Sequence, residues 1–322
     1  MAGKENDRPI AVYGAIVANL GIAVAKFIAA ALTGSSAMLS EGIHSLVDTG
    51  NQGLLLLGIR RSRTEPDTDH PFGHGKELYF WSLIVAVVLF GVGGGVALYE
   101  GFIRLNEPTE IVDPIISYVV LAIAFVMEGA SWTIAVREIG KESGSVGILR
   151  TIRSTKDPSV VTVLIEDSAA LLGLIFAFVG ILLADKLGDP RWDAVGSLAI
   201  GAILVIAATF LAFESRGLLI GERAETELLE KIRDTIEKTP GVRRVAELRT
   251  MHVGPEHIVV NAEVVVAGST DALMVVERVD RAVSDLDRRL DVTVEPQREA
   301  KSASGVDRAL PAERLDPHQG GS

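Results

Sequence analysis

Residues 36–52 of the chain read SAMLSEGIHSLVDTGNQ, which places ionisable side chains inside an otherwise apolar helical stretch. Residues 160–173, VVTVLIEDSAALLG, repeat this pattern with Glu166 and Asp167. An ionisable side chain at the centre of a bilayer costs ~2.5–3.5 kcal/mol on insertion scales, so such residues usually have a function. The two stretches therefore predict a polar site inside the helical bundle of a membrane protein.

The chemistry of this site is indicated by His44 and Asp48. The two residues are four positions apart, so they lie on the same face of a helix. An imidazole together with carboxylates is a typical ligand set for a divalent metal. The alternative is a hydrogen-bonded pair between helices that binds no ion.

The composition agrees with a membrane protein and excludes several classes. Of the 322 residues, 48% are hydrophobic, and the mean hydropathy is +0.34, which is high for a soluble domain. The chain has no cysteine, which excludes disulfides and thiolate metal sites. The net charge of −11 argues against nucleic acid as a partner, because phosphate binding needs clustered Lys and Arg.

Six segments are long and apolar enough to cross a bilayer, if polar interruptions are accepted. They are residues 10–33, 36–59, 78–104, 112–136, 159–184 and 191–214. Lys and Arg are concentrated in the loops after the second and fourth segments, which predicts that these loops and both termini are cytoplasmic. We expect a multi-pass protein of a prokaryotic plasma membrane.

The last third of the chain is different in character. Residues 222–238 and 271–290 have helical periodicity, whereas residues 245–253, 257–266 and 291–295 alternate as strands do. The predicted fold class is therefore an all-α bundle of six transmembrane helices, followed by a small cytoplasmic α+β domain of ferredoxin-like order α-β-β-α-β. The expected domains are residues 1–215 and 216–296, with a disordered tail at 297–322.

With these elements in place, the chain resembles the cation diffusion facilitator family, closest to its zinc-transporter-nine-like branch. The resemblance covers the chain to about residue 296, and three motifs carry it: GSSAMLSEGIHSLVD at 34–48, DTDHPFGHGK at 67–76, and Asp167. It implies a homodimer that uses alternating access. It also implies proton-coupled efflux of a divalent cation, zinc above all, with a manganese, iron(II), cobalt or cadmium exporter as the alternative. The metal is then the substrate, and no resident cofactor is expected.

The resemblance implies a tetrahedral transport site between the second and fifth spans, with His44, Asp48 and Asp167 as ligands. Many family members have a fourth ligand four residues before Asp167, but Val163 stands there in this chain. Glu166 is the expected substitute, or else a proton carrier beside the site. Asn51 is the other candidate, and its alternative role is a hydrogen bond between helices.

Further polar residues lie outside this set. Asp67, His70 and His74 in the loop after the second span predict either a second metal site or a structured turn that fixes the start of the third span. Lys26 is expected to snorkel or to pair with an acid. Glu128 is expected to act as a relay or to bond to a neighbouring helix.

The α+β domain is expected to carry no regulatory zinc cluster. The strand positions where the family often has metal-binding histidines are Ala246, Ala262 and Glu295 in this chain. His252 and His257, on either side of a predicted turn, are expected at the surface.

Two functions from other classes remain open at this point. An intramembrane metalloprotease would typically carry a His-Glu-x-x-His pair on one helix, and the chain has none. A metal-sensing membrane scaffold would use the α+β domain to bind partners. Metal flux into sealed vesicles would separate a transporter from both.

Overall fold

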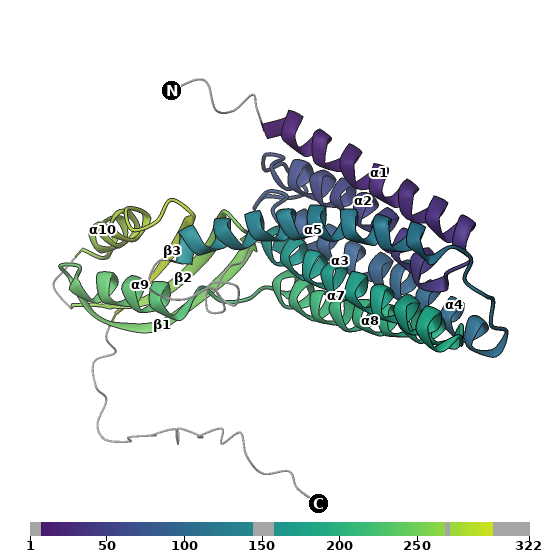
Figure 1. The fold of residues 1–322 in the computed structure, drawn as a ribbon. Helices are drawn as coiled ribbons and strands as arrows, with labels where there is room; N and C mark the ends of the chain where they lie inside the picture. Colours follow the sequence, from purple (N-terminus) through teal and green to yellow (C-terminus); the bar gives the residue numbers. More distant parts are fainter. Residues whose placement is uncertain (1–7, 144–157, 268–270, 299–322) are drawn as a thin grey trace, which may run out of the picture. The chain divides into compact units, whose positions relative to one another are not determined.

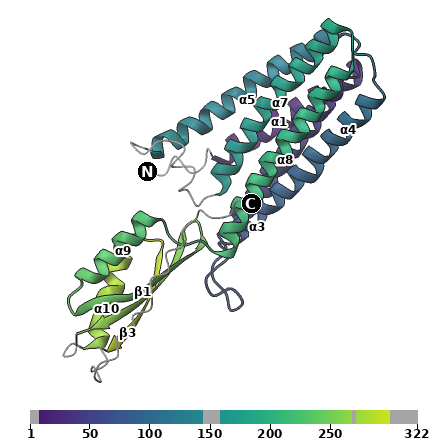
Figure 2. The same cartoon turned by 90° about the horizontal axis from the view of Figure 1, so that it is seen from below.

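The computed structural model describes residues 8–143, 158–267 and 271–298 (Figure 1). The chain forms two compact units, one mostly helical and one α+β. The helical unit contains α1 (Arg8–Thr33), α2 (Ser36–Ser62), α3 (Glu77–Val88), the π-helix η1 (Leu89–Gly94), α4 (Gly95–Asn106), α5 (Pro114–Ser143), α7 (Pro158–Leu187) and α8 (Arg191–Ile220). These helices lie alongside one another as a bundle in both views (Figures 1 and 2).

Six helical segments in the described part of this unit lie where the sequence predicts spans, because α3, η1 and α4 follow one another without a break. By length and composition, four of the described helices can cross a membrane: Glu77–Asn106, Pro114–Arg137, Val161–Leu187 and Arg191–Ile220. Helix α2 is not among these four, because ionisable residues interrupt its apolar sequence, and α1 contributes the shorter apolar stretch Asn19–Thr33. The count of six spans stays a prediction.

Helix α2 is central to the bundle, since it packs against α1, α3, α7 and α8. Close packing elsewhere depends on small residues. A Cβ on Gly201 of α8 would lie 2.7 Å from Cγ of Leu98, so α8 and α4 approach too closely for a larger residue. The glycine-rich end of η1 packs on the same part of α8, because a Cβ on Gly94 would lie 3.3 Å from the carbonyl oxygen of Gly201. These glycines therefore let η1, α4 and α8 pack closely.

The α+β unit contains α9 (Thr226–Lys238), β1 (Val242–Gly254), β2 (His257–Val266), α10 (Ala272–Ser284) and β3 (Leu290–Arg298). The three strands form one sheet in the order β1-β2-β3. Alternate residues of β2 are buried, and α10 buries a stripe at four-residue spacing formed by Val275, Val279 and Val283. The predicted order α-β-β-α-β is confirmed.

Three details of this unit differ from the sequence prediction. Helix α10 ends at Ser284 instead of residue 290, because turns occupy the residues before β3. The sequence suggests Ser269 or Thr270 as the cap of this helix, but the cap is the side chain of Asp271, which accepts a hydrogen bond from the backbone N–H of Leu273. Strand β3 continues to Arg298, past the predicted end of the domain at residue 296. Apart from residues 297 and 298, the predicted tail lies outside the described residues.

Candidate metal sites

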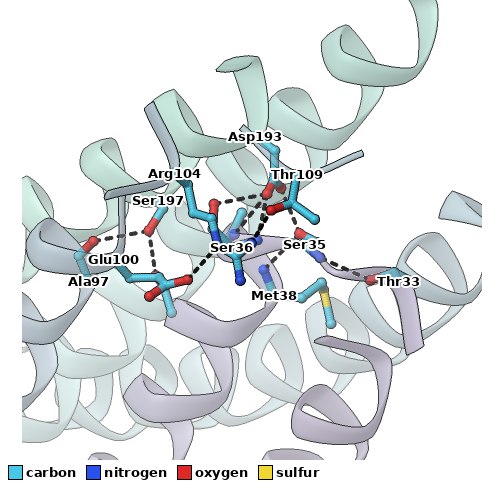
Figure 3. Close-up of polar contacts among 12 residues, drawn as sticks. Thr33, Ser35, Ser36, Met38, Ala97, Glu100, Arg104, Thr109, Asp193 and Ser197 are labelled. Atoms are coloured by element: carbon cyan, nitrogen blue, oxygen red, sulfur yellow. Dashed lines mark hydrogen bonds and ion pairs between the residues drawn. The ribbon is translucent and has the colours of Figure 1, made fainter. Parts of the chain in front are cut away.

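The start of α2 is held by a carboxylate from α8. Asp193 accepts hydrogen bonds from the hydroxyl of Ser35 at 2.6 Å and from the backbone N–H of Ser36 at 2.5 Å (Figure 3). A negative charge at this point also complements the positive end of the α2 dipole. One turn further along, the hydroxyls of Ser40 and Ser197 lie 2.5 Å apart, which again joins α2 to α8. The helix that carries the candidate ligands is thus fixed at its first residues.

His44 and Asp48 lie together on the buried face of α2. Nδ1 of His44 is 3.4 Å from Oδ1 of Asp48, and the His44 side chain is 1% exposed. Among the described residues, neither ring nitrogen of His44 nor Oδ1 of Asp48 has a hydrogen-bond partner. Buried polar atoms without partners are rare in proteins, and a bound ion or water is a common explanation for them. These atoms have the chemistry of metal ligands and are free to bind a cation.

The neighbouring polar residues join α2 to α7 and α7 to α5. Nδ2 of Asn51 donates to Oε1 of Glu166 at 2.7 Å, and both side chains are buried. Asp167, the next residue, is directed elsewhere: it accepts a hydrogen bond at 3.1 Å from the hydroxyl of Ser131 on α5. This divergence follows from the ~100° between adjacent residues of a helix. Ser131 was not singled out from the sequence, because an isolated serine in an apolar helix gives no signal.

The structure therefore brings some of the predicted ligands together and separates others. Glu166 faces the stripe of α2 that carries His44 and Asp48. Asp48 interacts electrostatically with Glu166 and, more weakly, with Asp167. The four predicted ligands do not form a cluster within mutual coordinating distance; among the described residues such a three-ligand cluster occurs in the loop before α3. The assignment of His44, Asp48, Glu166 and Asp167 as ligands stays a prediction.

A buried ion pair lies next to this set. Nζ of Lys26 on α1 is 2.9 Å from Oε2 of Glu41 and donates to Oγ of Ser45 at 2.7 Å, and the Lys26 and Glu41 side chains are fully buried. Lys26 therefore pairs with an acid and does not snorkel, which decides between the two expectations. Removing one partner of a buried pair typically costs ~3–5 kcal/mol, because the other charge is left uncompensated.

Glu128 lies on α5 and is 9% exposed. Its electrostatic interactions include Lys26 and Asp167, so it belongs to the same acidic region.

The loop residues Asp67, His70 and His74 form a compact cluster whose ligand atoms all lie within 4.8 Å of one another. Oδ1 of Asp67 is 3.2 Å from Nδ1 of His70, and Oδ2 is 3.6 Å from Nε2 of His74. The two imidazole rings are 4.3 Å apart between centroids. One carboxylate and two imidazoles at these distances have the composition of a zinc site with a position left for water.

The same loop is a structured turn, which is the second of its two predicted roles; metal binding by the cluster stays a prediction. The backbone N–H of Glu77 at the start of α3 donates to the carbonyl of His74, and Gly73 has a φ of +78° that favours glycine. The backbone N–H of His70 donates to Asp67 and lowers the pKa of that carboxyl, with a further contribution from the N–H of Asp69. Asp67 is thus held as a charged acceptor facing both histidines.

The histidines of the α+β unit differ from expectation in one case. His252 is 1% exposed, so the prediction of a surface residue is wrong for it; the last three residues of β1, His252 to Gly254, are all buried. His257 is partly exposed and lies 3.4 Å from a carboxylate oxygen of Asp291.

Comparison with known families identifies both parts of the chain. The cation efflux transmembrane domain matches residues 12–220, and the cation efflux protein cytoplasmic domain matches residues 224–297. The chain belongs to the cation efflux family. The predicted resemblance is thereby confirmed, and so is the arrangement of a membrane domain followed by a small cytoplasmic domain.

Several curated members of the family are similar to this chain. The human proton-coupled zinc antiporter SLC30A9, mitochondrial, is 36% identical over 241 residues, which are 74% of this chain and 42% of that protein. Metal tolerance protein C4 of Arabidopsis thaliana is 32% identical over 71% of this chain and 51% of its own length. The magnetosome protein MamM of Paramagnetospirillum magneticum is 28% identical over 75% of this chain and 72% of its own length.

The chain thus spans about half or less of the length of the first two relatives. Among solved structures, a nickel form of the MamM CTD is 28% identical and covers 24% of this chain and 100% of its own, with a TM-score of 0.22.

Proposed function

We propose that this protein exports divalent metal cations across a membrane in exchange for protons, with Zn²⁺ as the preferred substrate. The observation that carries the proposal is the buried pair of His44 and Asp48: the ring nitrogens of His44 and Oδ1 of Asp48 have no hydrogen-bond partner among the described residues. In a bilayer, such atoms are costly unless they bind something. The names of the similar proteins, a proton-coupled zinc antiporter and a metal tolerance protein, support the same activity.

The exchange follows from the chemistry of these side chains. A metal binds deprotonated ligands, so its arrival at His44, Asp48, Asp167 and Glu166 releases protons. After the bundle changes access, protons from the other side compete for the same atoms and release the metal. A histidine suits this role because its reference pKa is ~6.5, near the pH of most compartments. Because Asp167 bonds to Ser131 on α5, closure of the site around a metal would require Asp167 to exchange this bond for the ion.

The preference for zinc rests on the ligand types. One imidazole with carboxylates at low coordination number favours Zn²⁺. If the oxygens of Glu166 and Asn51 both join the site, the preference shifts towards manganese or iron(II). The proton-to-metal ratio decides the electrical cost: one proton in for one dication out moves one net charge, which an inside-negative potential opposes by ~2.3 kcal/mol per 100 mV. Two protons make the exchange electrically neutral.

The loop cluster of Asp67, His70 and His74 is proposed as a second, exposed metal site. A homodimer is proposed as the working assembly, and the membrane domain requires a lipid bilayer. A transport role also fits the ionisable residues of the α2 and α7 stretches better than an intramembrane hydrolase or a metal-sensing scaffold. The prokaryotic plasma membrane and the cytoplasmic side for both termini stay predictions.

Purified protein in sealed vesicles, with a metal-sensitive dye inside, tests the proposal directly. An imposed pH gradient should drive Zn²⁺ movement, and collapse of the gradient by an ionophore should stop it. A panel of Zn²⁺, Mn²⁺, Fe²⁺, Co²⁺ and Cd²⁺ in the same assay ranks the substrates. Vesicles that show no gradient-dependent movement of any of these ions would refute transport, and the hydrolase and scaffold alternatives would then be tested.

A further inference from the structure

Helices α2 and α7 run antiparallel along a shared interface, and two contacts fix their register. Asn51 of α2 bonds to Glu166 of α7 at one level. At the other level the Glu41 carboxylate of α2 lies against Gly173 of α7, where a Cβ would collide with Oε1 of Glu41. Glu41 precedes Asn51 while Gly173 follows Glu166, so the helices have opposite directions. The candidate ligands on α2 lie between these two contacts.

A full positive charge lies at the level of the contact between Glu41 and Gly173. The ammonium of Lys26 comes from α1, is completely buried, and bonds to Glu41 at 2.9 Å and to Ser45 at 2.7 Å. Ser45 is the residue directly after His44, so this charge stands beside the candidate site. The electrostatic interactions of His44 and of Asp48 both include Lys26.

Because of this arrangement, a dication that leaves the site along the α2–α7 interface meets a positive charge in one direction and an uncharged amide in the other. Glu41 lies three residues before His44, or ~4.5 Å of helix rise towards the start of α2. A dication that left the site in this direction would pass the Lys26 ammonium and the closed contact of Glu41 with Gly173. Repulsion between a dication and an ammonium is strong in a medium of low dielectric constant. At the other level, the contact between the helices is an uncharged amide on a carboxylate.

Resting on the proposed function, we propose that Lys26 is a coupling residue: its buried ammonium, held by Glu41 and Ser45, prevents an unexchanged cation from passing along the α2–α7 interface. Lys26 touches no candidate ligand atom and acts through its charge. One oxygen of Glu41, Oε1, lies against Gly173 and has no hydrogen-bond partner among the described residues, so Lys26 bonds the other oxygen, Oε2. A protein without this charge should still bind the metal, but it should let the metal pass without the exchange of protons.

The test uses the full chain in sealed vesicles with Zn²⁺ as the probe. Two rates are measured: Zn²⁺ movement driven by a pH gradient, and downhill Zn²⁺ movement with no pH gradient. Lys26→Met removes the charge at similar side-chain length and should raise the second rate at least ~tenfold while the number of protons per zinc falls. Lys26→Arg keeps the charge and should behave like the wild type.

A second variant separates the loss of the Lys26 charge from misfolding caused by an unpaired Glu41. Lys26→Met leaves Glu41 buried without a counter-charge, whereas the double variant K26M/E41Q removes both charges and keeps the side-chain volumes. The double variant should leak as the single variant does. The control is Arg104→Met, which breaks the ion pair between Arg104 and Glu100 within α4 and leaves Lys26 and Glu41 unchanged. This control should leave both rates unchanged.

The absence of cysteine from the chain permits a chemical rescue. In Lys26→Cys, the single thiol can be converted with 2-aminoethyl methanethiosulfonate to a side chain that ends in an ammonium, or with methyl methanethiosulfonate to a neutral one. Mass spectrometry measures the extent of each reaction. The ammonium should restore coupling, and the neutral cap should not.

The outcomes are distinct. A leak in the single and double variants, with rescue by the ammonium alone, supports the proposal. A double variant with the wild-type leak and the wild-type proton count overturns it, as does a neutral cap that restores coupling equally well. A wild-type protein that moves no Zn²⁺ under a pH gradient refutes the proposed function itself, and the proposal for Lys26 falls with it.

Discussion

Asn51 of α2 donates a hydrogen bond to Glu166 of α7, with 2.7 Å between Nδ2 and Oε1. This bond joins the two helices that carry the candidate ligands, and it turns Glu166 towards the stripe of His44 and Asp48. Asp167 is held apart from this stripe by Ser131. The bond therefore places the Glu166 carboxylate next to α2, and its role as a ligand in place of Val163 stays a prediction.

The first prediction concerns the charge of Glu166. Glu166→Gln keeps an acceptor for Asn51 and removes the negative charge, so it should weaken Zn²⁺ binding ~10–100-fold, about as much as Asp167→Asn does. Calorimetric titration in detergent at two pH values measures this. Unchanged affinity with a flattened pH dependence would instead make Glu166 a proton carrier. A variant equal to wild type in both respects would exclude Glu166 and leave Asn51 or water as the fourth ligand.

The second prediction concerns the two aspartates. Asp48→Ala and Asp167→Ala should each abolish zinc movement driven by a pH gradient, because each removes a proposed ligand, while the protein still assembles as a dimer. Asp185→Ala, which removes a carboxylate near the end of α7, is the control and should transport normally. Vesicle flux and size-exclusion chromatography measure the two properties. Near wild-type transport by either site variant would show that the ligand assignment is wrong.

The third prediction concerns metal choice. Nitrogen ligands favour zinc, and carboxylates suit harder ions. His44→Asp should therefore shift competition in the flux assay towards manganese or cadmium. The conservative control is His257→Asp in the α+β unit, which should leave the ranking unchanged. If His44→Asp also leaves it unchanged, His44 is not a ligand.

The sequence predicted the elements well because each has a strong local signal. Apolar length located the helices, and alternation located β1 and β2. The order α-β-β-α-β was confirmed, although turns before β3 end α10 at Ser284. The buried position of His252 was missed, because the last three residues of β1 are all buried while the residue type favours the surface.

The candidate site was less accessible from sequence because its contacts are made between helices. The pairing of Lys26 with Glu41 depends on the packing of α1 against α2, and no periodicity reports that packing. The bond from Ser131 to Asp167 depends in the same way on α5 lying beside α7. By contrast, Asn51 was expected on the stripe of His44 and Asp48, since a seven-residue spacing within one helix is a local property.

A fourth prediction addresses the loop cluster. His70→Ala combined with His74→Ala should lower the number of Zn²⁺ ions bound per chain by one, measured by equilibrium dialysis and metal analysis. Asp69→Asn, next to the cluster, should not. Asp67→Asn keeps an acceptor for the backbone N–H groups, so it should weaken metal binding while the turn persists. An unchanged stoichiometry in the double histidine variant would leave the turn as the role of these residues.

The pH dependence of this loop site follows from the lowered pKa of Asp67, whose main cause is the hydrogen bond from the backbone N–H of His70. A lowered pKa in the folded state means that the contribution of Asp67 is complete above the ordinary value of ~3.9 and is lost as the pH falls through the lower folded value. Protonation of Asp67 should therefore not contribute to any loss of metal between pH 7 and pH 5. Asp67→Asn should shift the affinity without moving the midpoint of this loss.

The fifth prediction concerns the anchor of α2. Asp193 accepts hydrogen bonds from Ser35 and Ser36, and all three side chains are buried (Figure 3). Asp193→Ala leaves these donors unpaired and removes the charge at the positive end of α2, so it should destabilise the protein by ~1–3 kcal/mol. Thermal unfolding in detergent measures the loss. Asp189→Ala is the control, because Asp189 lies before α8 and accepts a local hydrogen bond from the backbone N–H of Arg191; it should cost ~0.5–1 kcal/mol. An equal effect of the two substitutions would show that the link between α8 and α2 adds nothing beyond an ordinary local hydrogen bond.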